Sequence, residues 1–267
     1  MEVSGRTALV IGAQRPLGRA IAVALADGGV DVAVAGVSAE PRENFRVHSV
    51  ANELWAMDRR SIAVTLDVRD PASVGAAVQQ IDSEWGRLDI LVVAQDRLLA
   101  LPFDETGPDE WAEMLDANLT SAALACQAAG RLMMRERAMH GARPGQGGGV
   151  IGGASGGAIG GAIVNVVSTP AVEAGAGFVA YAAAAGGLVA MSRALAAEWA
   201  EWGIAVSVVE AGFGEDALLS AAPREAAHPP ALPDARPTPN ASIAAAVVDL
   251  IASGESGGVR RVRPTAS

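Results

Sequence analysis

Residues 165–185 read N-V-V-S-T-P-A-V-E-A-G-A-G-F-V-A-Y-A-A-A-A. The apolar run before Ser168 predicts a strand that is buried on both faces of a sheet. Tyr181 lies near the start of an alanine-rich run, 178–202, that predicts a long helix. A serine at a strand end followed by a tyrosine on the next helix suggests an active site in this stretch.

Short apolar runs alternate with helical patterns along the rest of the chain. This alternation predicts βαβ units joined by right-handed crossovers. We expect strands at residues 6–12, 30–35, 61–66, 88–93, 163–167, 204–209 and 259–262, and helices at 13–27, 42–60, 71–85, 110–137, 178–202 and 242–251. The fold class is α/β: one Rossmann-like domain over 1–267, a doubly wound parallel sheet with helices on both faces.

Two stretches interrupt this pattern. Residues 138–162 are so rich in glycine that neither a helix nor a strand forms cheaply, which predicts an insertion between a helix and a strand. Residues 214–240 are rich in proline and alanine and are expected to form either a lid over a cleft or a plain loop. The substrate pocket is expected beside this second stretch, in which we find no residue that is diagnostic of a substrate.

Composition narrows the function classes. A net charge of −10 argues against nucleic-acid and anionic-membrane partners, which require a basic surface. Cys126 is the single cysteine, so an internal disulfide is excluded. Met1 is followed by neither a basic leader nor a long apolar segment, so we expect a cytoplasmic protein and no membrane span. No metal site is expected, and the chain contains no lysine, so its 20 basic residues are all arginine.

The first strand is followed by a glycine turn, G-A-Q-R-P-L-G, that runs from Gly12 to Gly18 and opens a helix. Such a turn presents backbone N–H groups to a pyrophosphate. Gly12, Arg15, Leu17 and Gly18 are therefore candidate cofactor-binding residues.

The end of the second strand normally identifies the cofactor, because an acid there binds a ribose 2′-hydroxyl. Residues 36–38 are Gly-Val-Ser and supply no acid. Arg15 is then the cation that could reach a 2′-phosphate, which favours NADP over NAD, although a solvated loop arginine explains it equally well. Asp67 and Val68 end the third strand and are also candidate cofactor contacts, with Asp67 alternatively capping the helix near Pro71.

Asn118 is a polar amide among the leucines of the helix at 110–137. Such an amide is usually a satisfied structural residue and less often a catalytic one.

Several quoted segments occur together in the order of one known family: W-A-E-M-L-D-A-N-L from Trp111, the N-V-V-S run, the Tyr181 helix and W-G-I-A-V-S-V-V from Trp202. In these segments the chain resembles the short-chain dehydrogenase/reductase family, in its branch of 3-oxoacyl-acyl-carrier-protein reductases. The resemblance covers nearly the whole chain outside the glycine-rich and proline-rich stretches. It implies hydride transfer between a nicotinamide cofactor, NAD or NADP, and a carbonyl or carbinol carbon.

The resemblance also implies residue roles. A tyrosine is the acid/base, a serine polarises the substrate oxygen, an asparagine completes a proton relay, and a lysine holds the ribose and lowers the tyrosine pKa. Tyr181, Ser168 and Asn118 match the first three positions, but Ala185 stands at the lysine position. No lysine elsewhere in the chain can replace it.

Three further positions depart from the family pattern. Pro16 replaces the middle glycine of the turn, Asp96 stands where the segment after the fourth strand carries a glycine, and Ala211 replaces the proline of a Pro-Gly pair. These changes lie in the cofactor turn, in the segment expected to line the adenosine, and in the loop expected beside the nicotinamide. Together they predict a degenerate active site on a fold that is retained.

Three hypotheses follow. The first is a pseudoenzyme: a non-catalytic or weakly active subunit that forms an oligomer, pairing with an intact homologue through helices 110–137 and 178–202. The second is an active NAD(P)-dependent oxidoreductase that reduces a ketone or oxidises a secondary alcohol of 3-oxoacyl or 3-hydroxyacyl type, with Tyr181 in an altered site. The third is a module that senses a nucleotide or small ligand. A homo-oligomer and a hetero-oligomer both remain open.

Overall fold

The computed structural model describes residues 3–139, 160–168, 175–212 and 238–263. Most of the glycine-rich stretch and of the proline-rich stretch predicted from the sequence lies outside these residues. The segment directly after Ser168 lies outside them as well.

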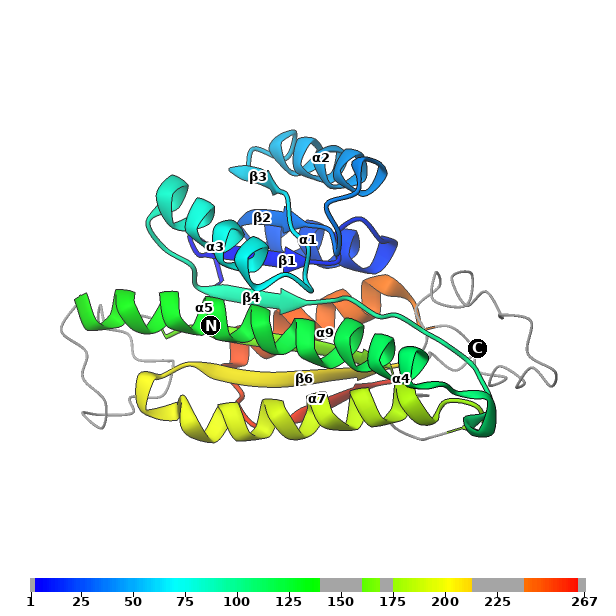
Figure 1. The fold of residues 1–267 in the computed structure, drawn as a ribbon. Helices are drawn as coiled ribbons and strands as arrows, with labels where there is room; N and C mark the ends of the chain where they lie inside the picture. Colours follow the sequence, from blue (N-terminus) through cyan, green and yellow to red (C-terminus); the bar gives the residue numbers. More distant parts are fainter. Residues whose placement is uncertain (1–2, 140–159, 169–174, 213–237, 264–267) are drawn as a thin grey trace.

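A seven-stranded parallel sheet forms the centre of the molecule (Figure 1), in the order β3-β2-β1-β4-β5-β6-β7. The strands are β1 (Thr7–Ile11), β2 (Asp31–Ala35), β3 (Ser61–Val64), β4 (Ile90–Val93), β5 (Ala162–Ser168), β6 (Ala205–Ala211) and β7 (Val259–Val262). β1 pairs with β2 on one side and with β4 on the other, so the strand order reverses between β1 and β4. The predicted doubly wound α/β fold is confirmed, and ligands of such sheets bind at the carboxyl ends of the strands near this reversal.

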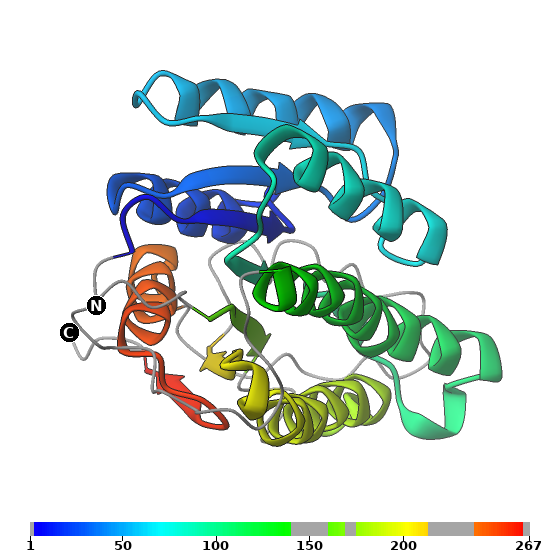
Figure 2. The same ribbon diagram turned by 90° about the vertical axis from the view of Figure 1, so that its left-hand side faces the viewer.

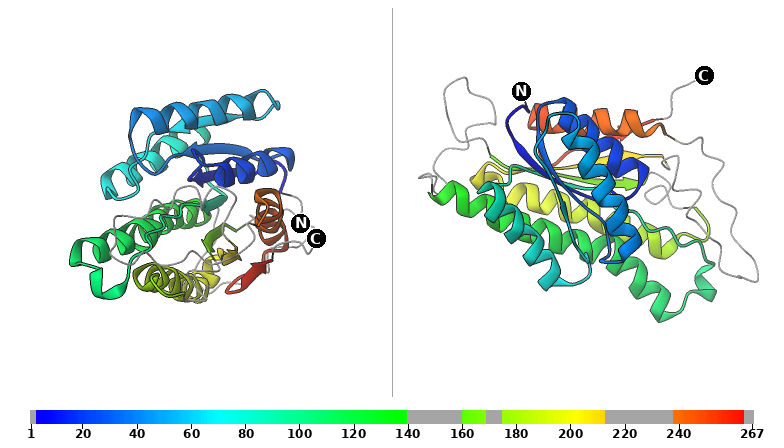
Figure 3. Two further views of the ribbon diagram at one scale, coloured as in Figure 1. Left: turned by 90° about the vertical axis from the view of Figure 1, so that its right-hand side faces the viewer. Right: turned by 90° about the horizontal axis from the view of Figure 1, so that it is seen from above.

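Two helical layers cover the sheet, as Figure 2 and the left panel of Figure 3 show from opposite ends. One core packs the sheet against α1 (Pro16–Asp27), α2 (Pro41–Trp55) and α9 (Asn240–Ser253). The other packs it against α3 (Pro71–Trp85), α5 (Ser121–Met139) and α7 (Val179–Glu198). The central strands β1, β4, β5 and β6 are buried at every residue, which explains their continuous apolar runs.

The helix predicted at 110–137 is interrupted. It consists of α4 (Pro108–Leu115), a π-helical turn η2 (Asp116–Thr120) and α5, and it follows a short 3₁₀ turn, η1 (Phe103–Glu105). Asn118 lies in the π turn and is buried. π turns inside helices are frequent at functional sites, because they change which side chains face the neighbouring elements.

The helix predicted at 178–202 ends earlier than the alanine pattern suggests. α7 stops at Glu198 and a 3₁₀ turn, η3 (Ala200–Trp202), follows it. Gly203 then adopts φ 64°, a left-handed conformation that glycine reaches without steric cost, and the chain enters β6.

Among the described residues, α7 alone is long and apolar enough to cross a membrane by length and composition. Buried positions along this helix, Tyr181, Leu188 and Ala196 among them, pack into the apolar clusters of the domain. A helix that is apolar on several faces and packs on a sheet is expected in a large α/β core.

Candidate active site

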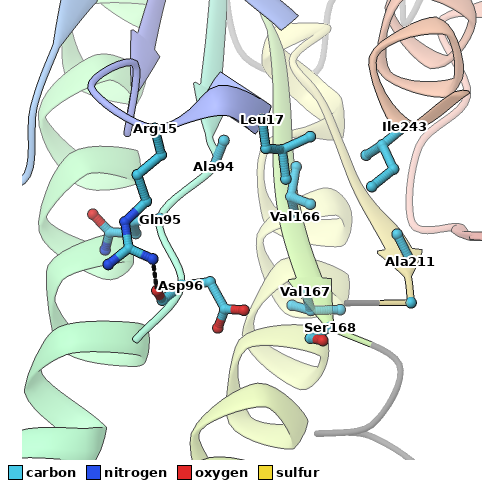
Figure 4. A pocket seen from close by; sticks show the side chains of 11 residues that line it. Arg15, Leu17, Ala94, Gln95, Asp96, Val166, Val167, Ser168, Ala211 and Ile243 are labelled. Atoms are coloured by element: carbon cyan, nitrogen blue, oxygen red, sulfur yellow. Dashed lines mark hydrogen bonds between the residues drawn. The ribbon is translucent and has the colours of Figure 1, made fainter. Parts of the chain in front are cut away.

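Two pockets open at the carboxyl edge of the sheet. The inner pocket lies beside β5 and β6 (Figure 4) and is lined by Arg15, Leu17, Ala94, Gln95, Asp96, Val166, Val167, Ser168, Ala211, Gly212 and Ile243. The outer pocket lies beside the ends of β2 and β3 and is lined by Arg15, Val37, Ser38, Glu40, Glu43, Val68, Arg69, Gln95, Asp96, Arg97, Glu113 and Ala117. Arg15, Gln95 and Asp96 line both pockets and therefore separate them.

Tyr181 is bound to a carboxylate. It lies in the first turn of α7 with 2% of its surface exposed, and its hydroxyl donates a hydrogen bond of 2.5 Å to Asp96 Oδ1. Asp96 lines both pockets, whereas Tyr181 is not among the described residues that line either. The carboxylate therefore stands between the phenol and the space that a ligand would occupy.

This environment keeps the phenol protonated. Burial raises the pKa of Tyr181 well above its ordinary value of 10.0, and the Asp96 carboxylate raises it further through its charge and by accepting the hydrogen bond. Ser168 and Arg15 lower the pKa more weakly. General acid/base catalysis works best when the pKa lies near the operating pH, so the shift has the wrong sign for efficient proton transfer.

Ala185 lies one helical turn after Tyr181, on the same face of α7. It is buried in an apolar cluster with Met114, Phe178 and Tyr181, against which Leu98, Leu99, Ala100 and Trp111 also pack. The position that carries a lysine in the family pattern is thus surrounded by apolar side chains. A cation placed there without a partner would carry a large desolvation cost.

Ser168 is the last residue of β5 and lines the inner pocket. Its Oγ is buried and lies close enough to the Tyr181 hydroxyl for a hydrogen bond that lowers the pKa of the phenol, an effect weaker than those of burial and Asp96. Of Asn118, Ser168 and Tyr181, Ser168 is the one that lines this pocket.

The Asn118 side-chain amide forms hydrogen bonds with backbone groups. Its Oδ1 accepts from the Arg97 N–H at 2.8 Å, and its Nδ2 donates to the carbonyls of Arg97 at 2.9 Å and Met114 at 3.2 Å. These bonds fix the residue that follows Asp96. In this structure the Asn118 amide positions the wall between the pockets.

Gly12 and Gly18 of the turn pack against backbone. A Cβ on Gly12, which has φ 94°, would lie 2.7 Å from the Ala94 carbonyl, and a Cβ on Gly18 would collide with the Gly12 carbonyl. Neither glycine is among the described residues that line the inner or the outer pocket. Both are required for the close approach of α1 to β1 and of β1 to β4.

Of the other turn residues, Arg15 and Leu17 line the pockets. Pro16 is the first residue of α1 and has no N–H to offer, while Leu17 lines the inner pocket. The Arg15 side chain crosses the cleft, where its Nη1 donates to the Asp96 carbonyl at 2.8 Å.

Of the two candidates at the end of β3, Val68 lines the outer pocket and Asp67 does not. Asp67 Oδ1 accepts from the Arg69 N–H at 3.0 Å, within its own turn. The alternative prediction that Asp67 caps the following helix is wrong: Asp70 is the N-cap of α3 and accepts from the Ala72 N–H at 2.9 Å.

Glu43 supplies the acid that seemed to be missing after β2. It lies in the first turn of α2, and its Oε2 accepts from the Val37 N–H at 3.4 Å, the Ser38 N–H at 3.0 Å and the Ser38 hydroxyl at 2.9 Å. The residues of the strand end do not reveal Glu43. Its signal in the sequence is an acid at the third position of a helix, from which a carboxylate can reach back to backbone N–H groups before the helix.

The chain was compared with known proteins. The family model for short chain dehydrogenases matches residues 6–143 and 154–225. D-threitol dehydrogenase of Mycolicibacterium smegmatis is 33% identical over 207 residues, which are 78% of this chain and 69% of the relative. The 3-oxoacyl-[acyl-carrier-protein] reductase FabG of Salmonella typhimurium is 32% identical over 225 residues, 83% of this chain and 78% of the relative.

Solved structures agree with the sequence relatives. A candidate short-chain alcohol dehydrogenase from Sinorhizobium meliloti 1021 superposes with a TM-score of 0.77 at 27% identity, covering 97% of this chain and 95% of the other. Acetoin dehydrogenase from Enterobacter cloacae gives a TM-score of 0.74 at 24% identity, covering 97% and 94%, and supports the fold alone.

Proposed function

Because the chain belongs to the short-chain dehydrogenase/reductase family of NAD(P)-dependent oxidoreductases, we propose that it is a family subunit with little or no hydride-transfer activity of its own. The observation that carries this proposal is the hydrogen bond from the Tyr181 hydroxyl to Asp96. The family reaction needs a tyrosine that exchanges a proton with a substrate oxygen. Here that proton is engaged by a carboxylate, in an environment that raises the phenol pKa.

The surroundings of Tyr181 support the same proposal. A lysine ammonium would lower the pKa of the phenol, and at its position Ala185 is packed in an apolar cluster. Loss of a proton-transfer group typically costs about 10²–10⁴ in rate. The Asp96 carboxylate adds to this loss because its negative charge opposes formation of the phenolate.

A dinucleotide cofactor with a free 2′-hydroxyl suits the outer pocket better than NADP. Glu43 is held at the end of β2 and would repel a 2′-phosphate, whereas its carboxylate is suited to accept a hydrogen bond from a hydroxyl. Arg15, on which the preference for NADP depended, is directed to the Asp96 carbonyl.

Assembly with an intact homologue is the second part of the proposal. The outer face of α7 carries Ala183, Gly186 and Ala190, all exposed and small, and a Cβ added to Gly186 would meet nothing within 4 Å. Small residues let two helices approach closely, which suits a subunit contact. Together with the helical run of α4, η2 and α5, α7 is the proposed interface.

The test is turnover by the isolated chain. NADH and NADPH oxidation is followed with a panel of 3-oxoacyl thioesters, diketones and simple ketones, with Tyr181→Phe as the matched control. We expect rates that do not differ between wild type and Tyr181→Phe. A rate that Tyr181→Phe abolishes would overturn the proposal.

The assembly part has its own readout. The tagged chain is expressed in its native host, recovered, and analysed by native mass spectrometry. We expect a hetero-oligomer with an intact short-chain dehydrogenase, and Gly186→Trp on the outer face of α7 should release that partner. A pure homomer would contradict the pairing.

One observation favours an alternative function, an active oxidoreductase for a ketone or secondary alcohol. Ser168 lines the inner pocket close to Tyr181, where a substrate oxygen could accept its proton. This alternative predicts a measurable rate in the turnover assay that Tyr181→Phe abolishes.

A further inference from the structure

The charges around the inner pocket are the reverse of those in the family pattern. That pattern places a lysine one turn after the tyrosine and a glycine in the segment after the fourth strand. In this chain Ala185, at the first position, packs among apolar side chains, and Asp96, at the second, lines the pocket and accepts from Tyr181. One positive charge is absent and one negative charge is added, so the space beside Tyr181 attracts a cation.

Arg15 is the other charged residue among the described residues that line this pocket. Its Nη1 donates to the Asp96 main-chain carbonyl at 2.8 Å. Figure 4 shows the guanidinium on one side of the Asp96 backbone and the carboxylate on the other side, directed toward Ser168. Among the causes that shift the pKa of Tyr181, the Asp96 charge comes directly after burial and Arg15 comes last. The carboxylate therefore dominates the part of the pocket next to Ser168.

Apart from the guanidinium, the polar side chains of the pocket have their donors engaged. Tyr181 donates its proton to Asp96, and a hydrogen bond between Ser168 and Tyr181 then uses the serine proton. Gln95 Nε2 donates to the Ala117 carbonyl at 3.1 Å. An ionised carboxylate only accepts hydrogen bonds, so Asp96 suits a ligand group that only donates them, such as an ammonium.

The inner pocket is small, and the rest of its lining is largely apolar. It encloses about 30 Å³, whereas a single water needs roughly 10–15 Å³. The space therefore accepts a head group of a few atoms and excludes a bulky one. Leu17, Val166, Val167 and Ile243 line it in Figure 4, and their side chains suit contact with the alkyl stem of a charged group.

We propose that the inner pocket binds the ammonium group of a primary alkylamine, with the Asp96 carboxylate as its counter-ion. A buried ammonium requires such a partner, because an unpaired charge carries a large desolvation cost. A lysine at position 185 would repel this ligand, and a glycine at position 96 would leave it without a counter-ion. Both departures from the family pattern therefore favour the same ligand chemistry. The inference goes beyond the proposed function, which concerns the loss of turnover and names no ligand for this pocket.

The experiment is a titration of the full chain with n-butylamine, n-butanol, butyrate and tetramethylammonium, followed by ligand-observed NMR at constant ionic strength. It is performed at about pH 7, where a primary amine is protonated. We expect n-butylamine to bind at least about tenfold more tightly than n-butanol, the equivalent of one hydrogen bond to a charged group. Butyrate has the opposite charge, and tetramethylammonium has a wider head without an N–H donor. Both should bind at least about tenfold more weakly than n-butylamine.

A pair of variants locates the binding. Asp96→Asn keeps the shape of the side chain and removes its charge, and it should weaken n-butylamine binding at least about tenfold. Asp104→Asn is the matched control, because it makes the same charge change at an exposed residue of η1 that is not among the described residues lining either pocket. It should leave the dissociation constant within about twofold, since salt screens exposed charges.

Several outcomes would overturn the inference: no detectable binding of n-butylamine, or binding of any of the other three probes that is as tight. Equal effects of Asp96→Asn and Asp104→Asn would overturn it as well. The comparison of the probes on the wild-type chain remains decisive if Asp96→Asn folds poorly.

The two proposals fail separately. Binding of n-butylamine that depends on Asp96, in a chain that also shows Tyr181-dependent ketone reduction, contradicts only the proposed function. A chain that neither reduces ketones nor binds n-butylamine contradicts only the ammonium site.

Discussion

The glycine turn and the wall of the cleft lie side by side at the edge of the sheet, and they differ in how they relate to the family pattern. Gly12 and Gly18 match the pattern, and both are required by backbone contacts inside the fold. Pro16, Asp96 and Ala185 depart from it: Pro16 begins α1 without an N–H, Asp96 lines both pockets and accepts from Tyr181, and Ala185 packs with Tyr181. The proposed loss of hydride transfer predicts this difference: positions required for packing are kept, and positions beside the tyrosine are not.

Gly18→Ala is the strongest test of the claim that the turn glycines are required for packing. The added methyl group collides with the Gly12 carbonyl, and backbone cannot move as a flexible side chain would. We expect a loss of about 3 kcal/mol in the free energy of unfolding, measured by urea denaturation. Gly75→Ala is the control, because a Cβ at Gly75 in α3 meets nothing within 4 Å. It should stabilise the protein by about 0.5–1 kcal/mol, and equal effects of the two changes would contradict the packing role.

The claim that Asp96 and Ala185 limit hydride transfer is tested by changing both residues back to the family pattern. Asp96→Gly releases the phenol, and Ala185→Lys places a cation one turn from Tyr181. We expect ketone reduction by the double variant to exceed wild type by about 10²-fold. Adding Tyr181→Phe should abolish the gain.

Ala183→Lys is the matched control, since it places the same cation on the exposed face of α7. A gain in Ala183→Lys, or none in the folded double variant, would show that Asp96 and Ala185 are not what limits the reaction.

Asn118 can act either as a structural residue or as part of a proton relay, and a substitution distinguishes these two roles. Its amide makes three hydrogen bonds to backbone groups, so Asn118→Ala leaves buried groups unpaired. We expect a loss of about 1–3 kcal/mol in unfolding free energy. In the restored double variant, Asn118→Ala should raise KM for the cofactor more than it lowers kcat; a selective fall in kcat would instead indicate a proton relay.

The smallest expected effect lies far from the cleft. Burial raises the pKa of Glu136 from 4.5 to about 7, while its Oε1 accepts from the Leu88 N–H. An acid whose folded pKa is raised destabilises the fold above that pKa, and the penalty disappears as the pH falls from about 7 towards 4.5. Thermal unfolding should therefore show Glu136→Gln more stable than wild type at pH 8, with the difference shrinking by pH 5. A difference that is constant with pH would refute the assignment.

The sheet could be predicted from the sequence because its signals are local. Apolar runs such as 88–93, each ending near glycine or polar residues, mark strands buried on both faces, and the helices between them set the parallel order. The break of the helix at Asp116–Thr120 was not predictable in this way. Its leucine periodicity is that of a continuous helix, and the bonds that Asn118 in the π turn makes to the Arg97 backbone cannot be read from local sequence.

Of the predicted site residues, Arg15, Leu17, Val68 and Ser168 line the pockets, and the contacts among the site residues were less predictable. Ser168, Tyr181 and Ala185 follow from position, but the bond between Tyr181 and Asp96 joins residues 85 apart in the chain. Asp96 was noted only as a charge in place of a glycine. Glu43 was missed because a helix, and not the strand end, carries it to the pocket.

The central claim is that the Tyr181 phenol is held protonated by Asp96. Tyr181 is the only tyrosine in the chain, so phenolate absorbance in a pH titration of the folded protein reports this one group. We expect no phenolate up to pH 10 in wild type, and a lower midpoint in Asp96→Gly/Ala185→Lys. A phenolate midpoint at about pH 7 in the wild-type protein, which efficient acid/base catalysis requires, would contradict the account.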